Sequence, residues 1–339
     1  MSHAEVAFRY AGRSGLRVER GNVRLGLATT ERRTFVDGRV DRADVLGAGL
    51  LVVAHVAAFR YDDPAGTSPR LADPFVTTGG DVVRFESLSG CGRVGARLDL
   101  LPGGLELTDH APGMTNVELG QRVRELLGGA LPRDPAHLEV GAAGLVLAPG
   151  GAVPHERRVA LPAGWLHTFA GLPSLLAAMT ARAELSARQA RTFVRSLAQG
   201  PVRGRTREPT GPAVAAALRV RVARDGLRLV AEPGPDCLPL VAPAALCELE
   251  PLLRHASGLR LWAHWPTGAT WWELDLPHAR LGIGLGLDGA ADAALARTEP
   301  EAAFGLVGYD MHSGWYERRV PVRRDLLEPT RSAGDTPVG

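Results

Sequence analysis

Lysine is absent from this chain of 339 residues, so all 39 of its basic residues are arginines. Arginine keeps its charge at any ordinary pH, whereas lysine can lose its proton when it is buried. A Schiff base and a lysine general base need the neutral amine of lysine, and a phosphate-loop lysine needs its compact ammonium charge. The sequence therefore excludes the enzyme classes that depend on a lysine.

Cysteine is scarce as well, with single residues at Cys91, Cys237 and Cys247. An odd number at wide spacing fits reduced thiols in a cytosol better than a disulfide framework. The cysteines and the ten histidines also lack the short spacings from which zinc sites are usually built. We therefore expect no metal and no cofactor, and a melting temperature that a chelator leaves unchanged.

Long apolar runs are missing too. The run from Leu50 to Phe59 is interrupted by His55 and is too short to cross a bilayer. The first residues have no basic and apolar secretory pattern. The sequence predicts a cytoplasmic protein without a membrane partner.

Familiar catalytic motifs are absent: there is no G-x-S-x-G elbow, no H-E-x-x-H and no Walker loop. The segment Gly282-Ile283-Gly284-Leu285-Gly286 has the glycines of a dinucleotide loop, but they alternate with apolar residues and no helix onset follows. This alternation predicts a packed, glycine-rich strand. No catalytic residue can be predicted from the sequence, and enzymatic activity stays uncertain.

What is present is a composition, 45% hydrophobic and 22% charged, that can bury sizeable cores. Alternation of apolar residues over the first 27 residues predicts an opening β-meander. Helices are expected at 44–59, 117–127, 173–182, 186–197 and 243–255, and strands at 82–87, 94–100, 138–147, 156–161, 218–222, 227–231, 259–265, 271–276 and 281–287. These elements predict an α+β fold of two sheet-rich units with packed helices.

Repeated glycine and proline between residues 199 and 212 predict the domain boundary. We expect an amino-terminal α+β domain at 1–200, a linker at 201–212 and a second α+β domain at 213–324. Residues 325–339 read as a disordered tail.

The densest polar pattern lies on the two expected strands at 82–87 and 94–100. Alternation places Arg84 with Glu86, and Arg97 with Asp99, so that arginine and carboxylate pairs can form between the strands. The candidate polar cluster consists of Arg84, Glu86, Cys91, Arg97, Asp99 and Asn116. It would be either a ligand site with a reactive Cys91 thiol or an ordinary face of paired charges, since no histidine lies near Cys91 in sequence to activate it.

Two arginine-rich stretches are the candidate basic contacts with nucleic acid: Arg203, Arg205, Arg207, Arg318, Arg319, Arg323 and Arg324. Flexible arginines can neutralise phosphates without reading sequence. The net charge of +2, however, does not indicate a polyanion partner. Four tryptophans, Trp262, Trp265, Trp271 and Trp272, are expected to close a core or to cover a subunit surface.

A series of short segments, in order along most of the chain, carries a family resemblance. They include Arg84-Phe85-Glu86-Ser87, Ala96–Pro102, Leu249–Arg254, Trp272–Pro277 and Gly308-Tyr309-Asp310. Together they resemble the amino-terminal region of the actinobacterial SWIM zinc-finger proteins. The cysteine and histidine pattern of the finger itself would follow Gly339 and is not part of this sequence.

Members of that family are encoded beside MoxR-type AAA+ ATPases and proteins with von Willebrand factor A domains, which implies a role in a multi-protein, ATP-driven system. The chain also departs from the family by lacking room for its helix-turn-helix-like insert, so the resemblance favours protein partners over DNA. The leading hypothesis is a non-enzymatic interaction or adaptor subunit of such a system. The alternatives are a nucleic-acid-binding module and, third, an enzyme built around Glu86, Cys91, Asp99 and Asn116.

Overall fold

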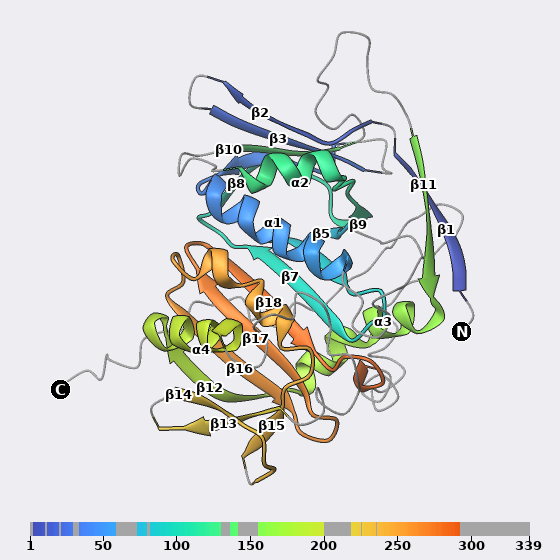
Figure 1. The fold of residues 1–339 in the computed structure, drawn as a ribbon. Coiled ribbons are helices and arrows are strands. Elements are labelled where there is room, and N and C mark those ends of the chain that lie inside the picture. Colours follow the sequence, from blue (N-terminus) through green and yellow to red (C-terminus); the bar gives the residue numbers. More distant parts are fainter. Residues whose placement is uncertain are drawn as a thin grey trace, which may run out of the picture.

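The computed structural model describes residues 3–10, 12–19, 22–29, 34–58, 73–79, 82–129, 136–141, 155–199, 218–224, 226–234 and 236–291. These residues form an α+β fold, which confirms the predicted fold class (Figure 1). The expected linker at 201–212 and the expected tail lie outside the described residues, and so does the Gly308-Tyr309-Asp310 segment.

The largest unit is an antiparallel sheet of eight strands. In order across the sheet they are β12 (Thr180–Ser186), β16 (Gly258–His264), β17 (Ala269–Leu276), β18 (Ala279–Leu285), β7 (Val94–Leu100), β6 (Val82–Leu88), β5 (Phe75–Gly79) and β9 (Gly113–Asn116). The expected strands at 82–87 and 94–100 are thus confirmed as β6 and β7. Because β7 pairs with β18, chain segments before and after 201–212 share one sheet. The boundary predicted at 201–212 therefore does not separate the strands of this sheet into two units.

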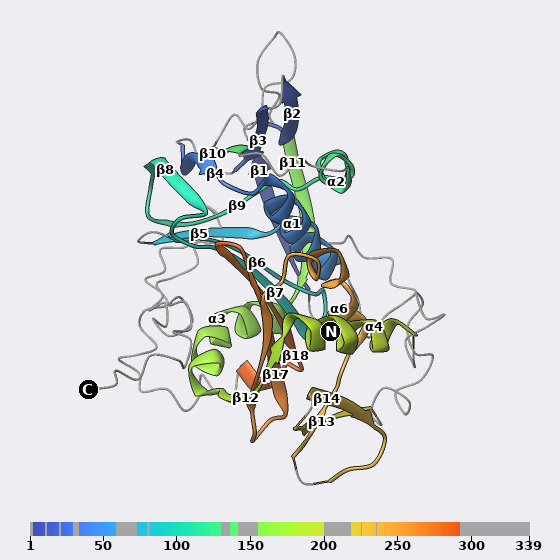
Figure 2. The ribbon, with the colours of Figure 1, turned by 90° about the vertical axis from the view of Figure 1, so that its left-hand side faces the viewer.

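One face of the sheet packs on helices α1 (Ala43–Ala58) and α4 (Ala187–Gln199), as Figure 2 shows on the side away from α3. The helix α1 is buried around most of its circumference. Its backbone approaches β7 so closely that a Cβ at Gly49 would lie 2.8 Å from Leu98. Further along the sheet, the ring of Phe193 on α4 stacks on Trp272 at 5.4 Å. This face carries the main apolar core and fixes the strands of the sheet in place.

The opposite face is covered at one end by α3 (Ala163–Ala178) (Figure 2). Apolar side chains of α3, including Phe169 and Leu172, pack there with Phe75, Leu88 and Trp271 of the sheet. The rings of Phe75 and Phe169 lie 5.1 Å apart. Beyond this apolar end, the same face of the sheet is charged.

A second sheet has the order β2 (Gly15–Glu19), β3 (Asn22–Ala28), β10 (Ala136–Gly141), β4 (Val36–Val40) and β8 (Leu105–His110). Only the β3–β10 pair in it is parallel. The first strand, β1 (His3–Tyr10), pairs with β11 (His155–Pro162) instead of β2. The expected opening meander is therefore wrong in its first pairing, although β2 and β3 do form a hairpin.

The remaining strands form a small sheet of order β14 (Gly226–Val230), β13 (Arg219–Ala223) and β15 (Cys237–Pro239). The helix expected at 243–255 is instead two short turns, α6 (Ala244–Cys247) and η1 (Glu250–Leu252), while α2 (Gln121–Gly128) is confirmed in part. Within the described part of the chain, no helix is long and apolar enough to cross a membrane.

Candidate functional site

The predicted arginine and carboxylate pairs form across β6 and β7, on the face of the large sheet beyond α3. Arg84 donates to Asp99 through Nε at 2.6 Å and Nη2 at 3.0 Å. Arg97 donates to Glu86 Oε1 through the same two nitrogens at 2.9 and 2.7 Å. The register that places Arg84 opposite Asp99 and Glu86 opposite Arg97 accounts for both pairs.

The pairing continues into strands from the later part of the chain. Arg280 on β18 stands opposite both Asp99 and Asp275, and its Nε lies 3.6 Å from Asp275 Oδ1. On β16, Arg260 Nη2 lies 2.8 Å from Glu273 and 2.6 Å from Asp275. We call the whole set the charge ladder: Arg84, Glu86, Arg97, Asp99, Arg260, Glu273, Asp275 and Arg280.

Sequence reasoning found only the half of the charge ladder that lies on β6 and β7. The other half carried a visible signal, because Glu273 and Asp275 alternate along β17. What the sequence did not show was that β18 would bring them beside β7. The missing information was the strand order and not the residue pattern.

The charge ladder is buried except at Asp275, which is partly exposed, and Arg84, Glu86 and Arg97 are each at most 6% exposed. Four arginines face four carboxylates, so the ladder is balanced when all are ionised. Burial acts to lower the pKa of Arg84, but Asp99 and Glu86 outweigh it and hold that pKa above its ordinary value. Removing one member of such a buried pair leaves an uncompensated charge and typically costs about 3–5 kcal/mol.

Glu273 is the carboxylate of the ladder whose burial is least compensated by hydrogen bonds. Burial raises its pKa to about 7, although Arg260 and Arg280 act in the opposite direction. The contact with Arg260 is short, yet Glu273 Oε1 has no hydrogen bond of good geometry. The same Arg260 nitrogen donates to Asp275 at 2.6 Å, so one donor serves two carboxylates and the desolvation of Glu273 is not repaid.

The ring of Trp271 occupies the space above Gly282, the position in the ladder that has no side chain. Gly282 stands between Arg97 and Glu273 in register, and a Cβ there would lie 2.1 Å from the Trp271 ring. The guanidinium of Arg97 lies 5.2 Å from the centre of that ring, within the range of a cation–π contact. Most of the glycine-rich segment thus lies in a packed strand, as predicted, and the structure places this strand between β17 and β7.

Cys91 and Asn116, the other two members of the candidate polar cluster, stand apart from the ion pairs. Cys91 lies in the turn after β6, where its Sγ is 3.4 Å from Ser89 Oγ. Asn116 at the end of β9 is fully buried, and neither polar atom of its side chain has a hydrogen-bond partner. No described contact joins either residue to Glu86 or Asp99. The geometry therefore adds no support to the enzyme alternative.

The candidate basic contacts lie outside the described residues. These are Arg203, Arg205, Arg207, Arg318, Arg319, Arg323 and Arg324. The structure therefore does not test the alternative that these arginines bind nucleic acid.

Trp265 differs from its neighbours by being exposed. Trp271 and Trp272 are at most 2% exposed, whereas Trp265, in the turn between β16 and β17, is 58% exposed. The guanidinium carbon of Arg182 lies 5.2 Å from the centre of its ring. Arg182 is in turn 3.2 Å from Asp236 and occupies a β-bulge, where the register of β12 shifts between Ala181 and Ala183.

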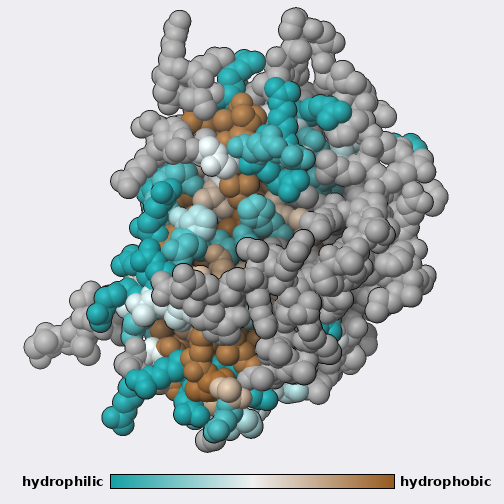
Figure 3. Space-filling view, in the orientation of Figure 1, coloured by the Kyte–Doolittle hydropathy of each residue, from teal (hydrophilic) through white to brown (hydrophobic). Residues whose placement is uncertain are grey.

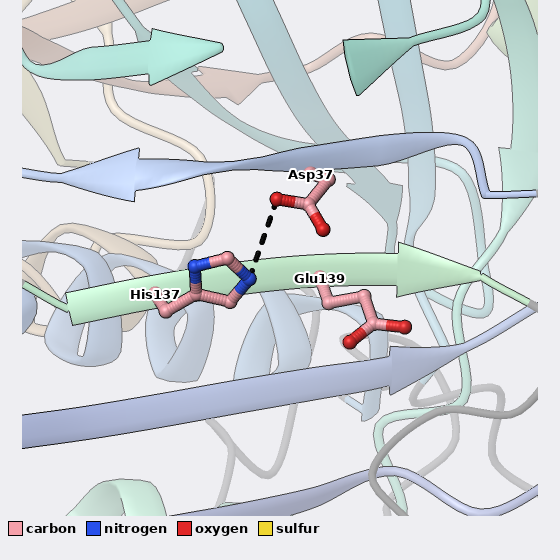
Figure 4. Close-up of side chains that lie close together, drawn as sticks. All are labelled: Asp37, His137 and Glu139. Atoms are coloured by element: carbon pink, nitrogen blue, oxygen red, sulfur yellow. Dashed lines mark ion pairs between the residues drawn. The ribbon is translucent and has the colours of Figure 1, made fainter. Parts of the chain in front are cut away.

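One described group of three side chains could hold a metal ion: Asp37 on β4 with His137 and Glu139 on β10 (Figure 4). Their ligand atoms all lie within 4.8 Å of one another. Asp37 is far from the other two in sequence, so spacing arguments missed the group. The alternation of His137 and Glu139 on one strand was the only local signal.

Comparison with known proteins gives no family. No protein-family model matches the chain, and no curated protein does. Two solved Caulobacter crescentus structures match the chain weakly. A DNA polymerase sliding clamp is 14% identical, with 81% of this chain and 69% of the clamp covered and a TM-score of 0.42. A β sliding clamp with polyethylene glycol bound is 13% identical, with 75% and 65% covered and a TM-score of 0.40. Likeness at this level assigns no function.

Proposed function

We propose that this chain is a non-enzymatic interaction or adaptor subunit that binds another protein through the end of the molecule that carries Trp265. The exposed Trp265 ring, stacked by Arg182, is the observation that carries the proposal. Tryptophan and arginine are the residues most enriched among those that dominate binding energy at protein interfaces. A large aromatic ring left in water gains a great deal of buried area when a partner covers it.

The turn that carries Trp265 packs against β15, and the Arg182 that stacks on its ring is itself paired. Gly268, with a φ of +74°, closes the turn after Trp265, and a Cβ at this glycine would lie 2.8 Å from Pro239 of β15. On the other side, Asp236 holds Arg182. A side chain that is already ordered loses less entropy on binding, so more of the contact energy contributes to affinity.

Apolar residues surround this end of the molecule. Leu218, Leu227 and Leu229 of the small sheet region are only partly buried against the core. In the space-filling view, hydrophobic side chains are visible at the surface near β13 and β15 (Figure 3). Apolar surface of this kind is typical of the centre of an interface.

The polar residues of the large sheet support a structural role over a catalytic one. The ion pairs of the charge ladder join arginines to carboxylates within the sheet, and all of its members except the partly exposed Asp275 are buried. A catalytic acid or base must instead reach a substrate.

The partner that we propose is a MoxR-type AAA+ ATPase or a protein with a von Willebrand factor A domain. This step rests on the resemblance of segments such as Ala96–Pro102 and Trp272–Pro277 to the actinobacterial SWIM zinc-finger proteins. An adaptor needs no chemistry of its own, which agrees with the lack of a recognised catalytic motif in the sequence.

The proposal is tested by recovering the tagged chain from cells of its own organism and identifying the proteins that accompany it. We expect an ATPase of this type or a von Willebrand-type protein to be enriched over an unrelated tagged protein. Recovery of the chain alone, under conditions that keep known ATPase complexes intact, would count against the adaptor function.

A further inference from the structure

The outer face of the five-stranded sheet brings one histidine and two carboxylates together. Glu139 is the direct cross-strand partner of Asp37 in the β10–β4 pair, and His137 lies two residues earlier on β10. Their neighbours in sequence, Val36, Leu138 and Val140, are fully buried on the inner face. Strict alternation along both strands therefore places Asp37, His137 and Glu139 on the same, outer face (Figure 4).

Distances within this group suit a small cation. His137 Nε2 and Asp37 Oδ1 are 3.3 Å apart. Two ligands of one tetrahedral zinc ion are about 3.3 Å apart when each is about 2.0–2.1 Å from the metal. The third ligand atom lies no more than 4.8 Å from the other two, and rotation of the flexible Glu139 side chain can close the remaining gap.

His137 Nε2 lacks a hydrogen bond. This nitrogen has almost no contact with solvent and no hydrogen-bond partner, although it lies within ion-pair distance of Asp37. A buried polar atom without a partner is costly. A cation between the two side chains would be a partner for His137 Nε2 and would also bind the carboxylate of Asp37.

The surroundings of Asp37 support a metal ligand. Thr108 on β8 donates to Asp37 Oδ1 at 2.7 Å and to the backbone oxygen of Asp37 at 3.0 Å. Hydrogen bonds of this kind orient the carboxylates that bind metals. Gly26, the neighbour of Glu139 on β3, adds no side chain that would crowd the group.

We propose that Asp37, His137 and Glu139 form a site for a divalent transition metal, with Zn²⁺ as its natural occupant. One imidazole nitrogen and two carboxylate oxygens are ligands that zinc accepts, and the two carboxylates neutralise its charge. Three protein ligands leave the fourth position open, as in sites that bind a further molecule. Arg24 and Arg39 flank His137 in register, and their charge limits the affinity to a moderate value.

The test is a calorimetric titration of the full chain with Zn²⁺ after dialysis against a chelator. We expect one Zn²⁺ per chain at this site and a binding constant that falls at least about tenfold in His137→Ala and in Glu139→Gln. The conservative Glu139→Gln variant keeps the test valid if His137→Ala unfolds, and circular dichroism reports folding for each protein.

Two matched controls separate this site from general surface binding. His55, which pairs with Glu248 at 2.9 Å on another surface, is replaced in His55→Ala, and an exposed carboxylate of α2 is removed in Glu125→Gln. Both controls should bind Zn²⁺ as the unaltered chain does. No Zn²⁺ binding by the unaltered chain, or equal losses in His55→Ala and in folded Glu139→Gln, would overturn the proposal.

Discussion

The buried face of the large sheet holds each arginine of the charge ladder against a carboxylate, and the weakest of these arrangements is at Glu273. Asp99 receives two donors from Arg84, whereas Glu273 shares the Arg260 nitrogen with Asp275. A carboxylate that loses its water without gaining full compensation keeps its proton to higher pH. The raised pKa of Glu273, about 7, is the result.

Stability should therefore depend on pH through Glu273. Its pKa is higher in the folded chain than the usual value of 4.5, so the folded state binds the proton more tightly. This contribution is fully present below pH 4.5, falls as the pH rises and is lost above about 7. Relative to Glu273→Gln, which cannot ionise, the free energy of unfolding of the unaltered chain should fall by up to about 3 kcal/mol across this window.

Urea unfolding at several pH values measures this difference. A pH-independent difference for Glu273→Gln would show that Glu273 ionises normally in the folded chain.

At the scale of the element, β18 shows why a glycine-rich strand can sit at the centre of a sheet. The Trp271 ring lies over Gly282 and takes the space that a side chain would fill. Gly282→Ala should force the ring or the strand to move and lower the free energy of unfolding by about 1–3 kcal/mol. Gly128→Ala, where nothing lies within 4 Å of the new Cβ, should leave stability unchanged or raise it slightly.

Thermal or urea unfolding of these two variants checks the expectation. A Gly282→Ala protein as stable as Gly128→Ala would mean that Trp271 does not need the empty position, and the proposed packing of β18 would be incorrect.

Local patterns predicted most elements but not their partners. The alternation in 82–87 and 94–100 predicted β6 and β7, and the helix expected at 186–197 is observed as α4, at whose start the Ser186 amide donates to Gln189 Oε1 at 2.9 Å. A helix was expected at 173–182, but α3 spans Ala163–Ala178 and contains Pro173 in its interior. The wider packing of α3 on the sheet outweighs the local signal.

The same limit applies to the candidate residues. Arg84 with Asp99 could be predicted because β6 and β7 form a hairpin, in which neighbouring residues follow from the turn. Asp37 with His137 could not, because β4 and β10 are separated by many other elements along the chain. Long-range pairing depends on how whole strands pack, and alternation alone does not specify it.

At the scale of the whole molecule, the eight-stranded sheet ties the early and late parts of the chain together. The pairs β12–β16 and β7–β18 each join a strand from residues 1–200 to a strand from residues 213–324. A partner that binds at Trp265 therefore contacts a hairpin that belongs to this continuous sheet.

The most direct test of the adaptor account is the affinity of the purified chain for the protein recovered with it, measured for Trp265→Ala and Leu126→Ala. Leu126 is the matched control, because it is also an exposed large apolar residue and lies on α2, at the opposite end of the view from β15 (Figure 1). The account predicts that Trp265→Ala weakens binding by at least about 2 kcal/mol, roughly thirtyfold in Kd, and that Leu126→Ala binds normally. Equal affinities for the two folded variants would contradict it.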